Sequence, residues 1–225
     1  MSDKIRICCM SDTHTLHDQV CIPECDLLLH AGDITGRGAA KQLKAFARWF
    51  DDQSNATHKV AIPGNHDHFC EDDPVNARRM FKKSHLIIDE TIELLGLKIY
   101  GTPWSPWFYD WAFNLPRRDK GVGKIAEACW AQIPEDTDIL LVHGPPHKIL
   151  DKVDHCFLNH NEDPHAGCPQ LLNRIKEIKP KLVVCGHVHE GHGANHSLMP
   201  DTMIVNASIC TLDYKPTNYP IMVYL

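Results

Sequence analysis

Three histidines lie within six residues in the stretch VVCGHVHEGHG, residues 183–193. They are His187, His189 and His192, and they come directly after an apolar run. Histidine is the commonest metal ligand in proteins and the usual general acid or base near neutral pH. The stretch therefore predicts either a metal site or a histidine-rich surface loop, and the choice depends on what else the chain brings to the same place.

Four other apolar runs also end in side chains that bind metals. Asp12 and His14 follow residues 5–10, Asp33 follows 27–31, Asn65, His66 and Asp67 follow 59–63, and His143 follows 139–142. Short apolar runs are typical of buried strands, and the carboxyl ends of strands in an open α/β sheet form its ligand crevice. We therefore expect seven candidate ligands to converge on one edge of the sheet: Asp12, His14, Asp33, Asn65, His143, His187 and His189.

The chemistry of this donor set indicates a catalytic metal centre. Oxygen and nitrogen donors without thiolate suit Mn²⁺, Fe or Zn²⁺ better than a structural zinc site. Seven ligands exceed the needs of one ion and suit two ions that share a bridging carboxylate, about 3.5–4 Å apart, as in two-metal hydrolases. Glycines beside Asp33, Asn65 and His187 let the backbone turn sharply there. We expect two divalent ions, with Mn²⁺ as the first candidate.

Strand-like and helical patterns alternate along the chain, which predicts a layered α/β fold. Apolar runs predict strands at 5–10, 27–31, 59–63, 139–143, 181–186, 203–208 and 221–225, and a hairpin at 92–101. Apolar residues at three- and four-residue steps predict helices within 39–52 and 167–178. No repeat or linker-like stretch interrupts the pattern, so one domain over residues 1–225 is expected. The least regular segments are 102–120 and 144–166, and long irregular segments in a compact domain are usually functional.

The composition argues against several classes of protein. The formal net charge is −6 over 225 residues, whereas a general nucleic-acid binder needs a basic surface that displaces counterions. No apolar run reaches about 18 residues, so no membrane helix is expected. The ten cysteines are scattered, and the first residues show no signal-peptide pattern, so reduced thiols and a cytoplasmic location are expected. The composition leaves the oligomeric state open.

Taken in order, the polar motifs resemble those of the calcineurin-like metallophosphoesterase superfamily. They are Asp12-Thr-His14, Gly32-Asp33-Ile-Thr-Gly36, Gly64-Asn65-His66-Asp67, His143 before Gly-Pro, and Gly186-His187-Val-His189. The second motif is one residue shorter than the superfamily's commonest spacing. The stretches 101–117, 143–146, 165–180 and 186–193 are also similar to the branch called metallophosphoesterase-domain-containing proteins, so the resemblance covers roughly residues 4–210.

The resemblance implies a fold and a role for each motif residue. The fold would be a four-layer α/β/β/α sandwich. Asp12, His14 and His189 would hold the first ion, Asn65, His143 and His187 the second, and Asp33 would bridge the two. His66 would bind no metal but would stabilise the phosphoryl group and protonate the leaving oxygen, with Asp67 or another carboxylate orienting it.

Aromatic residues between the motifs are candidates for substrate contacts. The stretch PWSPWFYDWAFNLPR at 103–117 carries three tryptophans, and Phe69 lies just past the third strand-end motif. Phe69, Trp104 and Trp107 could form a flat apolar wall for a nucleobase or another leaving group, and Arg117 could meet phosphate. Packing of the long loop onto the domain and a solvated surface arginine explain the same residues equally well.

Each motif also has a structural explanation when it is taken alone. Asp12 and His14 fit an Asx turn, the Asn65 motif fits a tight β-turn, and His143 fits a core histidine bonded to a carbonyl. His192 has no place in the motif set and is expected to be exposed or to support a ligand. His155, His160 and His165 with Cys156 and Cys168 form a second histidine–cysteine group, but their spacing fits no tight zinc template.

The expected function is therefore a dinuclear metal phosphoesterase, and most plausibly a phosphodiesterase that acts on small nucleotide-like substrates. The alternative within enzymes is a phosphomonoesterase or a phosphoprotein phosphatase. The alternative from another class is a metal-binding scaffold without catalysis. Hydrolysis of a phosphodiester, together with metal analysis, distinguishes these alternatives.

Overall fold

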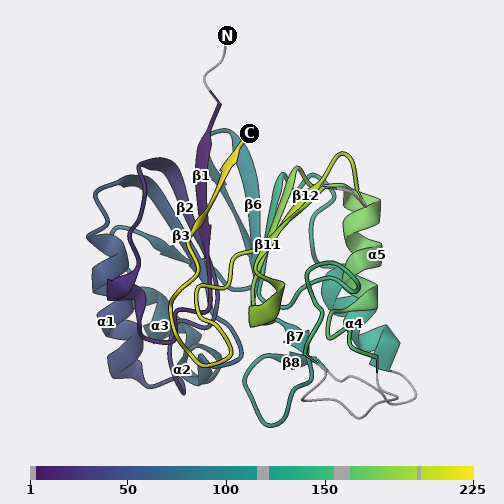
Figure 1. Cartoon of the computed structure of the whole chain (residues 1–225), viewed down its shortest axis with the longest axis horizontal. Coiled ribbons are helices and arrows are strands. Elements are labelled where there is room, and N and C mark those ends of the chain that lie inside the picture. Colours follow the sequence, from purple (N-terminus) through teal and green to yellow (C-terminus); the bar gives the residue numbers. More distant parts are fainter. Residues whose placement is uncertain (1–3, 116–121, 155–162, 197–198) are drawn as a thin grey trace.

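Two β-sheets face each other at the centre of the protein (Figure 1). The computed structural model describes residues 4–115, 122–154, 163–196 and 199–225. The first sheet has the order β13 (Ile221–Tyr224), β1 (Arg6–Met10), β2 (Cys25–Ala31), β3 (Ala56–Ile62) and β4 (His85–Leu86). The second has the order β11 (Gly193–Asn195), β12 (Met203–Asn206), β10 (Leu182–Cys185), β9 (Ile139–Val142), β6 (Leu97–Thr102) and β5 (Glu90–Leu94).

The central strands are buried on both faces because their apolar side chains alternate between two cores. On β1, Ile7 and Cys9 point into the core between the two sheets, whereas Cys8 and Met10 point into a core on the outer face. The second sheet contributes Leu141 and Val184 to the same inter-sheet core. This two-sided burial explains why the strands appear in the sequence as continuous apolar runs.

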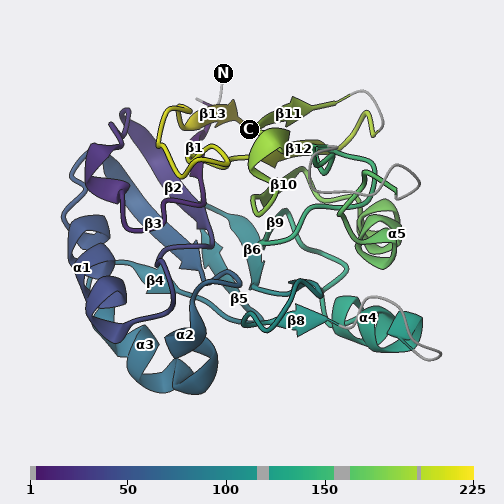
Figure 2. The same ribbon diagram turned by 60° about the horizontal axis from the view of Figure 1, so that its bottom comes forward.

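Helices cover the two outer faces. On the first sheet lie α1 (Ala40–Asp51), α2 (His68–Asp72) and α3 (Pro74–Met80), and on the second lie α4 (Val122–Trp130) and α5 (Pro169–Ile178) (Figure 2). The helical period predicted for 39–52 and 167–178 is confirmed, because α1 buries Phe46 and Phe50, and α5 buries Leu171 and Ile175. The layers therefore run helix, sheet, sheet, helix, which confirms the predicted four-layer sandwich.

The strands that carry the polar motifs run in parallel. β1 pairs in parallel with β2, and β2 with β3, in the first sheet; β9 pairs in parallel with β10 in the second. Their carboxyl ends therefore lie along a common edge, where the next residues of the chain carry the candidate ligands. The hairpin predicted for 92–101 is also present, as the antiparallel pair β5 and β6.

Some elements were not predicted from the sequence. The short helices α2, α3 and α4 are among them. The irregular segment 102–120 contains the paired strands β7 (Ser105–Pro106) and β8 (Asn114–Leu115). Within the described ranges, no helix is long and apolar enough to cross a membrane.

Candidate metal centre

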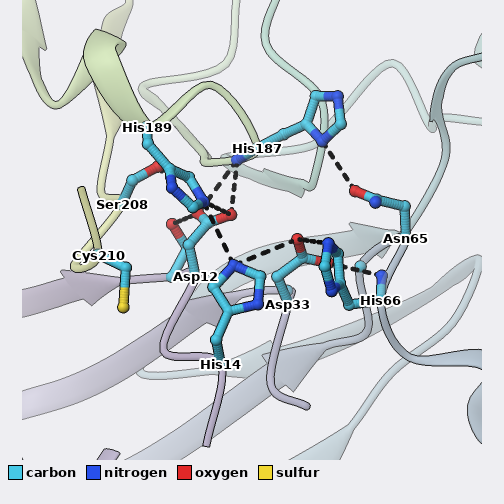
Figure 3. A network of polar contacts seen from close by, with 12 residues as sticks. Asp12, His14, Asp33, Asn65, His66, His187, His189, Ser208 and Cys210 are labelled. Carbon is cyan, nitrogen blue, oxygen red and sulfur yellow. Dashed lines mark hydrogen bonds and ion pairs between the residues drawn. The ribbon is translucent and has the colours of Figure 1, made fainter. Parts of the chain in front are cut away.

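Four of the seven candidate ligands sit in tight turns with left-handed backbone. Asp12, His14, Asp33 and His187 have φ angles of 52°, 41°, 56° and 68°. Residues other than glycine avoid this region, and such strain collects where the surrounding structure holds a functional side chain in place. The turns after β1, β2 and β10 therefore aim these side chains at one place, as Figure 3 shows.

The first group of donor atoms contains Asp12, His14 and His189. One donor atom from each lies within 4.8 Å of the others. His189 Nε2 is 3.4 Å from Asp12 Oδ1 and 3.2 Å from His14 Nε2. All three side chains are buried or nearly so, with Asp12 fully inaccessible to solvent. This is the set that the family resemblance implies for the first ion.

The second group contains Asn65, His143 and His187 around Asp33. His143 Nε2 and His187 Nδ1 each lie 2.8 Å from Asn65 Oδ1, and His143 Nε2 is 3.3 Å from Asp33 Oδ1. Asp33 also faces the first group, because its Oδ2 is 3.7 Å from His14 Nε2. Asp33 thus stands between the two groups, where a bridging carboxylate is needed.

The hydrogen-bond partners of the imidazoles indicate that these residues fit metal ions. His143 Nδ1 is 2.8 Å from the carbonyl oxygen of Ala31, which can only accept, so Nδ1 carries a proton. In the neutral ring, Nε2 then carries no proton, and its lone pair points at Asn65 Oδ1 and Asp33 Oδ1, which are also acceptors. His189 Nδ1 likewise lies 3.0 Å from the carbonyl of Thr211, so its Nε2 is the nitrogen that faces Asp12. Metal cations bound between these converging acceptor atoms would give their lone pairs a partner.

The charges of the group also favour cations. Burial alone would raise the pKa of Asp12, but the hydrogen bond with His189 and the neighbouring imidazoles hold it well below its ordinary value. The pKa of Asp33 is likewise lowered by the histidines around it, against the effect of burial. Burial lowers the pKa of His14 to about 4 and that of His187 to about 3. Two carboxylates and two neutral imidazoles are therefore the state at neutral pH.

His66 stands beside the two groups and is held from two sides. Its Nδ1 is 2.6 Å from the carbonyl oxygen of Gly36, and its ring stacks on Trp111 at 4.0 Å between centroids. Its Nε2 is left facing Asp33 Oδ2 at 3.9 Å. The donor atoms of His66, His14 and Asp33 also lie within 4.8 Å of one another, so the expectation that His66 binds no metal stays a prediction.

Asp67 has a different role from the expected one. Its carboxylate accepts hydrogen bonds from the backbone N–H groups of Ile34, Thr35 and Gly64 and from the Thr35 hydroxyl, at 2.8–3.1 Å. The carbonyl of Gly36, and not a carboxylate, receives the Nδ1–H of His66. Asp67 therefore fastens the turn after β2 to the turn after β3 and acts on His66 only through the backbone.

The aromatic side chains near the centre are not the expected ones. Phe69 packs against the outer core of the first sheet, and Trp104 donates its indole N–H to Asp89 at 2.9 Å while packing on both outer cores. Trp107 is 47% exposed and contacts Tyr109. The prediction that these three residues wall the substrate is not supported by their contacts, and Arg117 lies outside the described residues.

Three aromatic rings that the sequence reasoning did not single out do border the centre. Trp111 stacks on His66, Phe108 lies 6.1 Å from the His187 ring, and Tyr214 lies 4.7 Å from the His14 ring and 5.7 Å from the His189 ring. Trp111 and Phe108 lie in the aromatic stretch at 103–117, but nothing in that stretch distinguishes them from Trp104 and Trp107, and no sequence signal marks Tyr214.

Two polar residues at the end of β12 and just after it, Asn206 and Ser208, complete the surroundings of Asp12. Ser208 Oγ is 2.9 Å from Asp12 Oδ2, and the Asn206 amide contacts the turn that carries His187. The stretch VNAS at 205–208 thus reaches the centre (Figure 3).

The remaining histidines and cysteines bind elsewhere. His192 Nε2 is 3.1 Å from the carbonyl of Tyr219, away from both donor groups. Of the second histidine–cysteine group, His165 pairs with Asp151 at 2.7 Å, and Cys168 accepts the indole N–H of Trp130 at 3.2 Å. Its other members, His155, Cys156 and His160, lie outside the described residues. The described cysteines are all free thiols.

Sequence comparison places this fold and site in a known family. A family model described as calcineurin-like phosphoesterase matches residues 5–191. The chain therefore belongs to the calcineurin-like phosphoesterases, a family of metal-dependent phosphoric ester hydrolases.

Individual relatives agree with this placement. The chain is 36% identical to human metallophosphoesterase domain-containing protein 1 over 98% of its own length and 71% of that protein. It is 32% identical to the Caenorhabditis elegans UPF0046 protein C25E10.12 over 98% of its length and 80% of the relative. The crystal structure of TT1561 from Thermus thermophilus shares the fold, with a TM-score of 0.61 at 15% identity over 90% of this chain and 88% of that one.

Proposed function

We propose that the protein is a phosphodiesterase that uses two divalent ions, with Mn²⁺ as the first candidate, to hydrolyse small nucleotide-like phosphodiesters. The observation that carries the proposal is the pair of buried donor groups on either side of Asp33, with His66 beside them. Asp12, His14 and His189 would hold one ion, Asn65, His143 and His187 the other, and Asp33 both. Bound ions would clamp the phosphate oxygens and supply an activated water for in-line attack.

The geometry of His66 supports a role as general acid. Because Gly36 fixes Nδ1 as a donor, Nε2 is the nitrogen that faces the donor groups. In the imidazolium form of the ring, Nε2 would give its proton to a leaving oxygen and the ring would become neutral, with Nδ1–H still bound to Gly36. The stacked Trp111 ring prevents the imidazole from turning away. A proton supplied at this position matters most for a leaving group that is a poor one, such as a ribose oxygen.

The surface around His66 supports a substrate with a planar organic group. Trp111 and Phe108 come from one loop and Tyr214 from another, and Phe108 and Tyr214 are 47% and 51% exposed. The guanidinium of Arg37 lies 5.7 Å from the Trp111 ring and is a cationic group at this border. Rings of this kind stack on nucleobases without sequence preference. The net charge of −6 disfavours long nucleic acid as the substrate, and the free thiols agree with a cytoplasmic location.

The test is a substrate panel after chelation. Protein stripped of metal and then supplied with Mn²⁺ should hydrolyse bis-(p-nitrophenyl) phosphate and nucleotide diesters faster than p-nitrophenyl phosphate or a phosphopeptide. A preference for the monoesters would instead support the phosphomonoesterase or phosphoprotein phosphatase. Two bound ions without hydrolysis of any ester would support the non-catalytic scaffold.

A further inference from the structure

The carboxamide of Asn206 binds both peptide carbonyls that flank His187. Asn206 ends β12 and is fully buried. Its Nδ2 lies 3.3 Å from the carbonyl oxygen of Gly186, 2.8 Å from that of Val188, and 3.1 Å from that of Leu150. One side chain thus grips the turn on both sides of a candidate ligand and ties it to the loop after β9.

The turn that Asn206 grips is strained. His187 has a φ of 68°, which only glycine adopts without cost. The His187 N–H donates to both carboxylate oxygens of Asp12, at 3.0 and 3.1 Å. Gly186 is pressed so closely on this carboxylate and on the Ser11 hydroxyl that any side chain there would collide with them. The strained conformation therefore persists only while its neighbours hold it.

The other end of the same amide reaches Asp12. Asn206 Oδ1 accepts from the Ser208 N–H at 3.2 Å and lies 2.8 Å from the Ser208 hydroxyl, which is 2.9 Å from Asp12 Oδ2. Figure 3 shows Ser208 beside Asp12 on the side away from Asn65. Asn206 is thus linked to both donor groups but contacts no candidate donor atom of either.

The first donor group has supports of its own. His189 is fixed by its Nδ1 bond to Thr211, and Asp12 also accepts a hydrogen bond from Ser11. His187, by contrast, belongs to the second group, and its backbone depends on Asn206 for two of its flanking contacts. Loss of the amide should therefore affect the two groups unequally.

We propose that Asn206 is a positioning residue that holds His187 in its left-handed turn and thereby sets the affinity for the second ion. The proposal rests on the two-ion function proposed above. Side chains that orient metal ligands from outside typically contribute 10–100-fold to metal affinity. The expected consequence is a protein that keeps its fold and its first ion but binds the second ion weakly.

The experiment is a Mn²⁺ titration of metal-free protein by calorimetry, together with electron paramagnetic resonance. Wild-type protein should bind two ions and give the spectrum of a spin-coupled pair. Asn206→Ala should bind the first ion with an affinity within about threefold of wild type and the second ion about 10–100-fold more weakly. When one further equivalent of Mn²⁺ is added after the first site is full, the spectrum of isolated Mn²⁺ should therefore dominate. Asn218→Ala is the matched control, because Asn218 also donates to a carbonyl, that of Ser208, but does not touch the His187 turn.

The outcomes separate this inference from the function beneath it. A second ion bound within threefold of wild type in Asn206→Ala would overturn the inference, and so would equal weakening of both ions or an equal effect of Asn218→Ala. If Asn206→Ala does not fold, Asn206→Ser keeps one donor and should weaken the second ion by a smaller factor; unchanged affinity there overturns the inference. A wild-type protein that binds only one ion would instead contradict the proposed two-ion function.

Discussion

The two sheets meet in two regions of different polarity, an apolar core between their faces and a polar edge. Between their faces lies a dry core of aliphatic side chains, with Leu27 and Val60 from the first sheet against Leu141 and Val184 from the second. At their common edge, carboxylates, an amide and imidazoles face each other. There, His143 Nε2 lies 2.8 Å from Asn65 Oδ1 and 3.3 Å from Asp33 Oδ1, which are contacts between acceptors. The first region stabilises the fold without any ligand, whereas the second brings together acceptors that repel one another until cations separate them.

The origin of the donors at the edge sharpens this contrast. The first sheet supplies every oxygen donor, from Asp12, Asp33 and Asn65, whereas the second supplies only imidazoles, from His143, His187 and His189. Each donor group combines residues that follow strands of both sheets. The metal centre therefore depends on the alignment of the sheets, which the core sets, while the core needs nothing from the centre.

The largest expected effect comes from the carboxylate shared by the two donor groups. Asp33→Asn should reduce activity by more than about 100-fold, because it weakens the binding of both ions. A loss of about 100-fold is the upper end of what is seen when a residue that only orients a metal ligand is removed. Metal analysis should show fewer than two ions per chain. Asp51→Asn is the matched control: this buried carboxylate binds the N–H groups of Lys82 and Lys83 far from the centre, so the variant should keep both ions. Full metal content with full activity in Asp33→Asn would contradict the shared bridge.

The next largest expected effect distinguishes the role of His66 from that of the metal ligands. His66→Ala should leave metal content near normal and slow the hydrolysis of alkyl diesters about 10²–10⁴-fold, the usual range for general acid catalysis. The loss should be smaller for p-nitrophenyl esters, since that group leaves without a proton. The control is His68→Ala, because the His68 ring lies 5.8 Å from Trp111, the ring that stacks on His66. This variant should change the hydrolysis rate of neither ester class much. Equal losses for both ester classes would assign phosphate binding to His66, and lost metal would make it a ligand.

A change in the core between the sheets should lower the stability of the fold without changing metal binding. Leu27→Ala should lower the free energy of unfolding by about 2–5 kcal/mol, because the residue is fully buried between the sheets. The number of ions bound by the folded protein should stay the same. Leu95→Ala, at a position 40% exposed, should change the stability by no more than about 0.5 kcal/mol in urea denaturation. Loss of metal in folded Leu27→Ala would show that the two regions are not separable.

The last effect is a pH dependence of the metal-free protein. Burial lowers the pKa of His14 to about 4 and those of His30 and His187 to about 3, from 6.5 in the unfolded chain. Between pH 6.5 and 5 the unfolded chain binds protons that the folded chain does not, so stability should fall as the pH falls, by up to about 1.4 kcal/mol per pH unit for each ring.

A fourth histidine, His189, affects a different pH window. Although burial opposes it, Asp12 raises the pKa of His189 to about 9, so its contribution is complete below pH 6.5 and is lost as the pH rises toward 9. Urea denaturation in the presence of chelator at several pH values measures both trends. His30→Leu, which removes a buried ring outside both donor groups, should reduce the acid slope; an unchanged slope would show that the buried rings do not cause it.

Much of this organisation was predictable because strand burial and ligand position share one signal. Apolar runs that end in Asp33 or His143 show both where a strand stops and what chemistry begins, and the parallel order of the strands makes those ends meet. Helices α2 and α3 were not predictable in the same way, because five and seven residues are too short to show a 3.6-residue period.

The border of the centre was the least predictable part. Trp104 and Trp111 lie in one aromatic stretch, and only the path of the loop decides that the first packs on the cores and the second on His66. Tyr214 reaches His14 across 200 residues of sequence through a turn with positive φ, which no local pattern indicates. The role of Asp67 was missed because hydrogen bonds to backbone N–H groups leave no residue-type signature in the partners.

The left-handed turns at Asp12, His14, Asp33 and His187 have a consequence for how this sequence tolerates change. Each such residue costs on the order of 1–2 kcal/mol relative to glycine, and a domain has only about 5–15 kcal/mol of net stability. A mutational scan scored by cellular abundance should therefore favour glycine or asparagine at His14 and His187, whereas the same scan scored by catalysis should reject them. Asp12 and Asp33 differ, because their buried carboxylates accept the N–H groups of His187 and His66. Selection for abundance alone would convert this enzyme into a more stable protein that no longer binds its ions.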